Sequence, residues 1–173
     1  MILRSFAGKW PVIHPTAWIA ENAVIIGDVT IGARANIWYN VVIRADTNTI
    51  RIGDETNIQD GSVLHAETIE GPCIIGKRVT IGHIAIVHGC IVEDETVIGM
   101  GSKVLSYAKI GRGALVAAGA LVREHMIVPP EMIVAGVPAK ERGKVTDDMK
   151  ARFTSGCDQY LALAEEYRKS IST

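Results

Sequence analysis

The chain has few aromatic residues, few cysteines and almost no net charge. Aromatic side chains make up 5% of its 173 residues, and the formal charge at pH 7 is -1. A near-neutral chain gives no reason to expect nucleic acid or an anionic membrane surface as a partner. It has no apolar run long enough to cross a bilayer, so no membrane-spanning helix is expected.

The chain also lacks an apolar stretch near its N-terminus that would suit a signal peptide. Its cysteines, Cys73, Cys90 and Cys157, are odd in number and irregularly spaced, which predicts free thiols rather than a disulfide framework. We therefore expect a cytoplasmic protein, or an organellar one whose transit peptide has been removed.

Aliphatic residues recur every six positions over most of the chain. The runs start at Ile13, Ile52, Ile75 and Val92, and the last continues to Val134. A period of six fits neither an α-helix nor a simple alternating strand. It fits a short strand followed by a corner, with three such units closing a triangular coil. We predict an all-β fold, a parallel β-helix over residues 1–140, with the aliphatic residues inside.

Glycine often follows the aliphatic residue directly, and we expect it to let the backbone turn at the corners. These positions are Gly32, Gly53, Gly76, Gly82, Gly99 and Gly111.

A helical pattern begins at about Thr146, after the segment AGVPAK has ended the repeat. Thr146 can cap this helix, and residues 141–173 are predicted to pack against the β-helix. The apolar residues recur at steps of three and four: Met149, Phe153, Cys157, Tyr160, Ala164, Tyr167 and Ile171.

The repeat loses its register three times, in the steps 43–52, 64–75 and 87–92. A regular stack is favourable, so function can explain such irregularity, although loops are also inserted into coils for other reasons. Beside the breaks lie residues that could take part in chemistry: Arg44, Asp46, His65 and His88.

Three histidines are candidate metal ligands. The eighteen residues between His65 and His83 predict one wall in adjacent coils, with His88 on the next wall. His65 and His88 each follow an inward residue and should point outward, whereas His83 should point inward unless the corner turns it. One chain would struggle to bring all three to one ion, so a trimer with shared sites is expected. The alternative is that each is an ordinary hydrogen-bonded histidine.

Two segments, IRADTNTIRIGDETNIQDGSVLHAE and IGHIAIVHGC, resemble the γ-class carbonic anhydrases, and the likeness covers essentially the whole chain. This family consists of left-handed β-helices built from hexapeptide repeats. The resemblance implies a homotrimer in which His65 and His88 of one chain and His83 of its neighbour bind zinc. Iron and cobalt also suit three histidines.

The same resemblance implies roles for other residues. Gln59 would hydrogen-bond the metal-bound hydroxide that converts carbon dioxide to bicarbonate. Glu67 is the first candidate for proton transfer, with Glu70 as a second, and Tyr160 is a candidate to overhang the site. An ion-pair network at the trimer interface would contain Arg44, Asp46 and Asp60, with Asn57 beside it.

Two features depart from the family pattern. The loop over residues 66–74 is short, and Thr47 stands where relatives carry a second glutamate. We therefore expect turnover that is slow or dependent on buffer. Two alternatives stay open: hydrolysis or transfer of acyl groups on coenzyme A, and a non-catalytic metal-binding scaffold.

Overall fold

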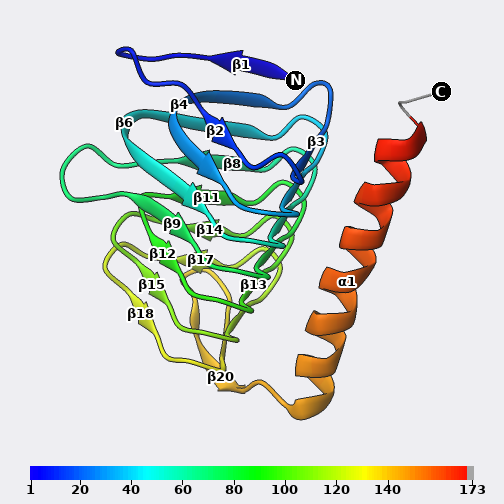
Figure 1. Ribbon diagram of the computed structural model, residues 1–173. Helices are drawn as coiled ribbons and strands as arrows, with labels where there is room; N and C mark the ends of the chain where they lie inside the picture. Colours follow the sequence, from blue (N-terminus) through cyan, green and yellow to red (C-terminus); the bar gives the residue numbers. More distant parts are fainter. Residues whose placement is uncertain (171–173) are drawn as a thin grey trace.

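The computed structural model describes residues 1–170 and shows a left-handed parallel β-helix of about seven turns with one helix beside it (Figure 1). Each short strand pairs in parallel with the equivalent strand one coil away. The predicted fold class is therefore confirmed.

Short strands form the three walls of the prism. The first wall contains β8 (Val63–His65), β11 (Ile86–His88), β14 (Lys103–Val104) and β17 (Leu121–Val122). The second contains β9 (Cys73–Ile75), β12 (Ile91–Val92), β15 (Lys109–Ile110) and β18 (Ile127–Val128). The third contains β3 (Trp18–Ile19), β5 (Asn36–Ile37), β7 (Asn57–Ile58), β10 (Thr80–Ile81), β13 (Val97–Ile98), β16 (Leu115–Val116) and β19 (Met132–Ala135).

Two longer strands join the first two walls near the N-terminal end. They are β4 (Val24–Ile31) and β6 (Val42–Ile52), and β6 pairs with β8 through its first half and with β9 through its second. The first predicted register break therefore lies within a continuous strand. The N-terminal strands β1 (Ile2–Arg4) and β2 (Val12–Ile13) pair with β4.

The aliphatic residues of the repeat fill the prism, as the period of six predicted. Ile25, Ile58 and Val116 have no exposed area, and burial of one such side chain contributes about 1.5–3 kcal/mol. Ile13 and Ile19, in the first coil, are only partly buried.

The glycines after the aliphatic residues are not the turning residues, so that expectation was wrong. The left-handed backbone conformation at the corners is adopted by other residues, such as Arg34 (φ 55°) and Glu55 (φ 59°). Gly53 is needed for close stacking, because a Cβ there would lie 2.5 Å from the carbonyl carbon of Gly76 in the next coil.

The last coil is followed by β20 (Lys140–Lys144), which pairs antiparallel with β19. The helix α1 (Asp147–Ser170) then runs back along the third wall (Figure 1). The backbone N–H of Met149 donates to the Thr146 hydroxyl at 3.3 Å, so Thr146 caps the helix as predicted. Ile171, placed on the apolar face by its spacing, lies outside the described residues. Within residues 1–170, no helix is both long and apolar enough to cross a membrane.

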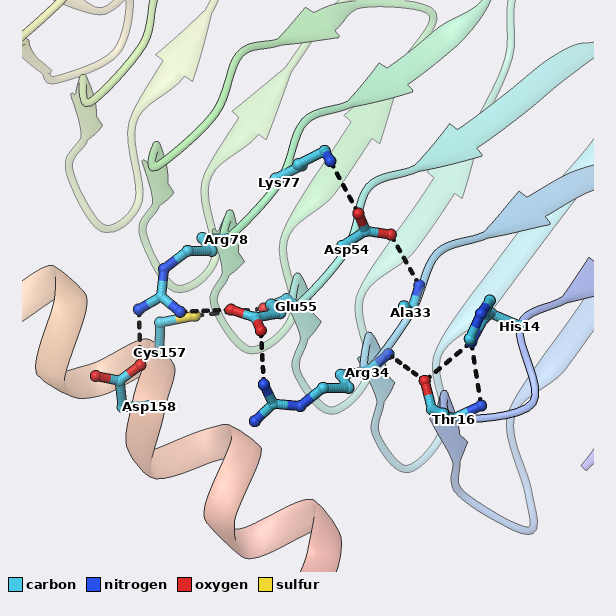
Figure 2. A network of polar contacts seen from close by, with 10 residues as sticks. All are labelled: His14, Thr16, Ala33, Arg34, Asp54, Glu55, Lys77, Arg78, Cys157 and Asp158. Atoms are coloured by element: carbon cyan, nitrogen blue, oxygen red, sulfur yellow. Dashed lines mark hydrogen bonds and ion pairs between the residues drawn. The ribbon is translucent and has the colours of Figure 1, made fainter.

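Two groups of contacts hold α1 on the prism. An aromatic cluster joins helix and wall, with ring centroids 5.3 Å apart for Trp38 and Tyr160 and 5.4 Å for Trp18 and Tyr167. Further along, the ion pairs Arg34–Glu55, Glu55–Arg78 and Arg78–Asp158, at 2.7, 2.6 and 2.6 Å, run from a corner of the coils to the helix (Figure 2).

Candidate metal centre

A column of polar side chains crosses the coils on the outside of the first wall. Arg44 of β6 is in register with His65 of β8, and His65 is in register with His88 of β11. Each residue follows an aliphatic residue that points inward, so its own side chain points outward. This confirms the outward direction expected for both histidines.

The rings of His65 and His88 face each other. Nδ1 of His65 lies 2.9 Å from Nε2 of His88, and their centroids are 5.0 Å apart. Each ring also has a partner for its other nitrogen. Asp46 Oδ1 lies 2.9 Å from His65 Nε2, and Ser106 Oγ lies 2.9 Å from His88 Nδ1. We call Asp46, His65, His88 and Ser106 the paired-histidine cluster.

The wall assignment made from the spacing was wrong. His65 and His88 share the first wall, whereas His83 lies at the corner between β10 and β11. The reason is the loop over residues 66–72, which lengthens this coil, so that equivalent positions are 23 residues apart rather than eighteen.

His83 belongs to a second cluster. Its Nδ1 lies 3.0 Å from Asp60 Oδ2, and its Nε2 lies 3.4 Å from the hydroxyl of Tyr160 on α1. The His83 side chain is 38% exposed, so the corner turns it outward. We call His83, Asp60 and Tyr160 the His83 cluster. Its contacts do not reach the paired-histidine cluster, and Asp60 pairs with His83 while Arg44 pairs with Asp46.

The amide side chains of Asn57, in β7, and Gln59, directly after β7, are hydrogen-bonded to each other. Gln59 Nε2 donates to Asn57 Oδ1 at 3.0 Å, and Asn57 Nδ2 donates to the Thr80 hydroxyl at 2.9 Å. This direction of donation leaves the carbonyl oxygen of Gln59 and one N–H of its amide for other partners. Both side chains are almost fully buried.

Glu67 lies in the short loop after β8, and its carboxylate is held on both sides. One oxygen accepts from the backbone N–H of Thr68 at 2.7 Å, and the other lies 3.2 Å from the Ser106 hydroxyl. Thr47, which replaces the second glutamate, donates to the carbonyl of Ala66 at 2.7 Å and so holds the start of this loop.

The electrostatics of the clusters follow from burial and hydrogen bonding. Burial raises the pKa of Asp46, but hydrogen bonds with His65 and Arg44 outweigh it and keep the pKa below its usual value. Burial lowers the pKa of His88, and the nearby His65 adds to this effect. Burial also raises the pKa of Tyr160, with a smaller contribution from Asp60.

The paired-histidine cluster fits part of a zinc site. Two nitrogens bound to one tetrahedral zinc at about 2.0–2.1 Å are roughly 3.3 Å apart. The facing nitrogens of His65 and His88 are 2.9 Å apart, so a small movement would admit an ion. The outer partners Asp46 and Ser106 are of the kind that orient metal-binding histidines. Within residues 1–170, however, no group of three or more histidine, cysteine, aspartate or glutamate side chains is arranged to hold an ion.

Ser106 is the member of this cluster that the sequence reading missed. A signal was available, because Ser106 follows His88 by eighteen residues, the length of one regular coil. The column on the first wall therefore continues from His65 through His88 to Ser106.

The coils and the paired histidines define a hexapeptide-repeat β-helix protein with a candidate metal centre. Residues 11–45 match the family described as bacterial transferase hexapeptide (six repeats). A crystal structure of a hexapeptide transferase family protein from Anaplasma phagocytophilum is similar, with a TM-score of 0.92 and 41% identity. The match covers 96% of this chain and 98% of that one.

Sequence relatives identify the family. A carbonic anhydrase of Geobacillus kaustophilus is 44% identical over 167 residues, which cover 96% of this chain and 91% of the relative. γ Carbonic anhydrase 1 of Arabidopsis mitochondria is 43% identical over 170 residues, covering 95% of this chain and 62% of that protein. The chain thus spans about three fifths of the plant relative. The chain belongs to the γ-class carbonic anhydrase family, which confirms the resemblance seen in the sequence.

Proposed function

We propose that the protein is a zinc-dependent carbonic anhydrase whose sites lie between the subunits of a homotrimer. In this arrangement His83 of one chain completes the site begun by His65 and His88 of another. The observation that carries the proposal is the facing pair, whose ring nitrogens are 2.9 Å apart and which has no third ligand beside it among the described residues.

An exposed apolar surface beside His83 supports contact with a second copy of the chain. Ile84 is 71% exposed and Met100 58%, and both lie on corners of neighbouring coils. The backbone N–H of Gly101 donates to the carbonyl of His83 at 2.8 Å, so the two corners are adjacent. Exposed apolar side chains grouped in this way are typical of interaction surfaces.

The residues of both clusters suit hydration of carbon dioxide, in which water and carbon dioxide give bicarbonate and a proton. Zinc held by three neutral imidazoles supplies Lewis-acid activation of water at neutral pH. We propose that the Gln59 carbonyl oxygen accepts a hydrogen bond from the reacting water, with Asn57 fixing the amide. Arg44, Asp46 and Asp60 would pair across the interface, where Arg44 and Asp60 meet only if two chains associate.

Glu67 and Tyr160 are proposed to line the same site. Glu67 is linked through Ser106 to His88, and the Tyr160 hydroxyl contacts His83 directly. We also propose a reducing compartment such as the cytoplasm, because Cys73, Cys90 and Cys157 are all buried free thiols.

The shared site can be tested by mixing two variants. His65→Ala and His83→Ala should each lose bound zinc, because each removes one ligand from every site. When the two are unfolded and refolded together, about one quarter of the interfaces combine both intact halves, if a symmetric trimer forms at random. Those interfaces should regain zinc and carbon dioxide hydration. His14→Ala, which lies outside both clusters, is the control and should retain zinc.

Failure of mixed trimers to regain zinc, with trimers confirmed by sedimentation, would contradict the shared site. A different activity has to be tested on the same samples, because the solved structure from Anaplasma phagocytophilum is described as a hexapeptide transferase family protein. Zinc binding together with thioester hydrolysis and no carbon dioxide hydration would favour acyl chemistry. Zinc binding without either activity would favour a non-catalytic scaffold.

A further inference from the structure

Ser106 connects a proposed metal ligand to a charged loop residue. Its hydroxyl lies 2.9 Å from Nδ1 of His88 and 3.2 Å from a carboxylate oxygen of Glu67. We propose that Ser106 is a positioning residue that, together with Glu67, fixes the tautomer of His88 so that Nε2 is free to bind a metal. This inference rests on the proposed function, since it concerns the same site.

The direction of the hydrogen bonds follows from the chemistry of the three groups. A glutamate carboxylate at neutral pH only accepts hydrogen bonds, and a serine hydroxyl has a single proton to donate. Ser106 therefore donates to Glu67. Having no second proton, it must accept the N–H of His88 Nδ1.

The consequence for His88 is a proton on Nδ1 and a lone pair on Nε2. That Nε2 faces Nδ1 of His65 at 2.9 Å. Asp46 accepts from Nε2 of His65 in the same way, so Nδ1 of a neutral His65 also carries a lone pair, and a metal ion or a shared proton must lie between the two rings. A ligand histidine with its outer nitrogen hydrogen-bonded binds metal better, because the ring is already oriented and in the correct tautomer. Glu67 thereby acts on the His88 ring through Ser106 and does not contact the ring itself.

The loop around Glu67 is packed so that this contact is maintained. A Cβ at Gly71 would lie 2.4 Å from the Cβ of Glu67, and one at Gly89 would lie 2.7 Å from it. The Tyr107 hydroxyl donates to the carbonyl of Ile69 at 3.1 Å and ties down the tip of the loop. Two glycines thus leave room for Glu67 where Ser106 can reach it.

A second serine of the same coil provides a matched control. Ser102 is fully buried and its hydroxyl donates to the carbonyl of Gly99 at 2.7 Å, without contact to either cluster. Ser106 is also buried, with 5% of its area exposed. Ser102→Ala and Ser106→Ala therefore remove comparable buried hydroxyls, but only the second touches His88.

The experiment measures zinc affinity of the full-length protein by competition with a chromophoric chelator. Ser106→Ala should weaken binding about 10- to 100-fold, the usual effect of losing an outer partner. Ser106→Thr should restore much of the affinity, because it keeps a hydroxyl. Ser102→Ala should bind zinc like the wild type. Unchanged affinity in Ser106→Ala, or equal loss in Ser102→Ala, would overturn the proposal.

A measurement on zinc-free protein separates this inference from the proposed function. Nitrogen-15 NMR of the wild type should show a proton on Nδ1 of His88, whether or not Nε2 also shares a proton with His65, and Ser106→Ala should show Nδ1 only partly protonated. A wild-type His88 with no proton on Nδ1 would contradict the assignment whether or not zinc binds. Wild-type protein that binds no zinc but shows the Nδ1 tautomer would instead count against the proposed function alone.

Discussion

Asp28 of β4 joins the segment between β1 and β2 to the long strand β6. It pairs with Lys9 at 2.7 Å and with Arg51 at 2.7 Å, and its side chain is only 22% exposed. The hydrogen bond from Lys9 is the main cause that lowers the pKa of Asp28, and burial opposes it in part.

The lowered pKa of Asp28 predicts that the protein loses stability in acid. A carboxyl with a lowered pKa in the folded state stabilises the protein above its unfolded pKa of about 3.9, and the contribution disappears as pH falls through the folded value. Asp28→Asn should therefore cost up to about 1 kcal/mol at pH 7 and much less at pH 3. Urea unfolding at the two pH values measures this. The same difference at both would exclude a role for the ionised carboxylate.

The sequence predicts which residues belong to the candidate site better than it predicts which of them contact one another. His65 and His88 follow inward residues next to register breaks, so their outward direction was predictable. Their mutual contact was not, because it depends on how far the loop over residues 66–72 shifts the following coil. Ser106 was missed for the same reason, since its place on the column is clear only after His88 has been placed on the first wall.

At the scale of elements, two glycines should respond in opposite ways to replacement by alanine. Gly53 has backbone atoms of the next coil within 2.5 Å of the position of an added Cβ, so Gly53→Ala should destabilise the prism by about 1–3 kcal/mol. Gly156 lies within α1 with nothing within 4 Å, so Gly156→Ala should stabilise the helix by up to about 1 kcal/mol. Thermal melting of both variants measures the effect. A stabilising Gly53→Ala would show that the coils are not closely stacked at this corner.

The predictable elements were those with a strong period. The repeat of six identified the inward residues of nearly every coil, and steps of three and four identified the face of α1 that carries the buried Cys157 and Ala164. β20 was not predictable in this way. All five of its residues, KERGK, are exposed, so no alternation of apolar and polar residues marks it.

At the scale of the whole molecule, the two clusters lie on different surfaces of the same chain. A contact that brings the paired-histidine cluster of one chain to the His83 cluster of another joins unlike surfaces, and such contacts close into a ring when the rotation permits. Closure with three chains would give three equivalent sites. The proposed trimer is therefore supported by two separate clusters that each lack part of a metal site, and by the exposed Ile84 and Met100 beside His83.

Zinc should consequently stabilise the assembled trimer, and it should not stabilise a chain that offers only His65 and His88. A ligand that binds only the folded assembly adds about 2.7 kcal/mol per site at a hundred times its Kd. After treatment with a chelator, adding zinc should raise the melting temperature of the wild type and of His14→Ala by several degrees, to be measured by scanning calorimetry at fixed protein concentration. His83→Ala should show little change, because it leaves only the two facing rings of His65 and His88. An equal rise in His83→Ala would mean that one chain holds the ion alone, and the shared site would be excluded.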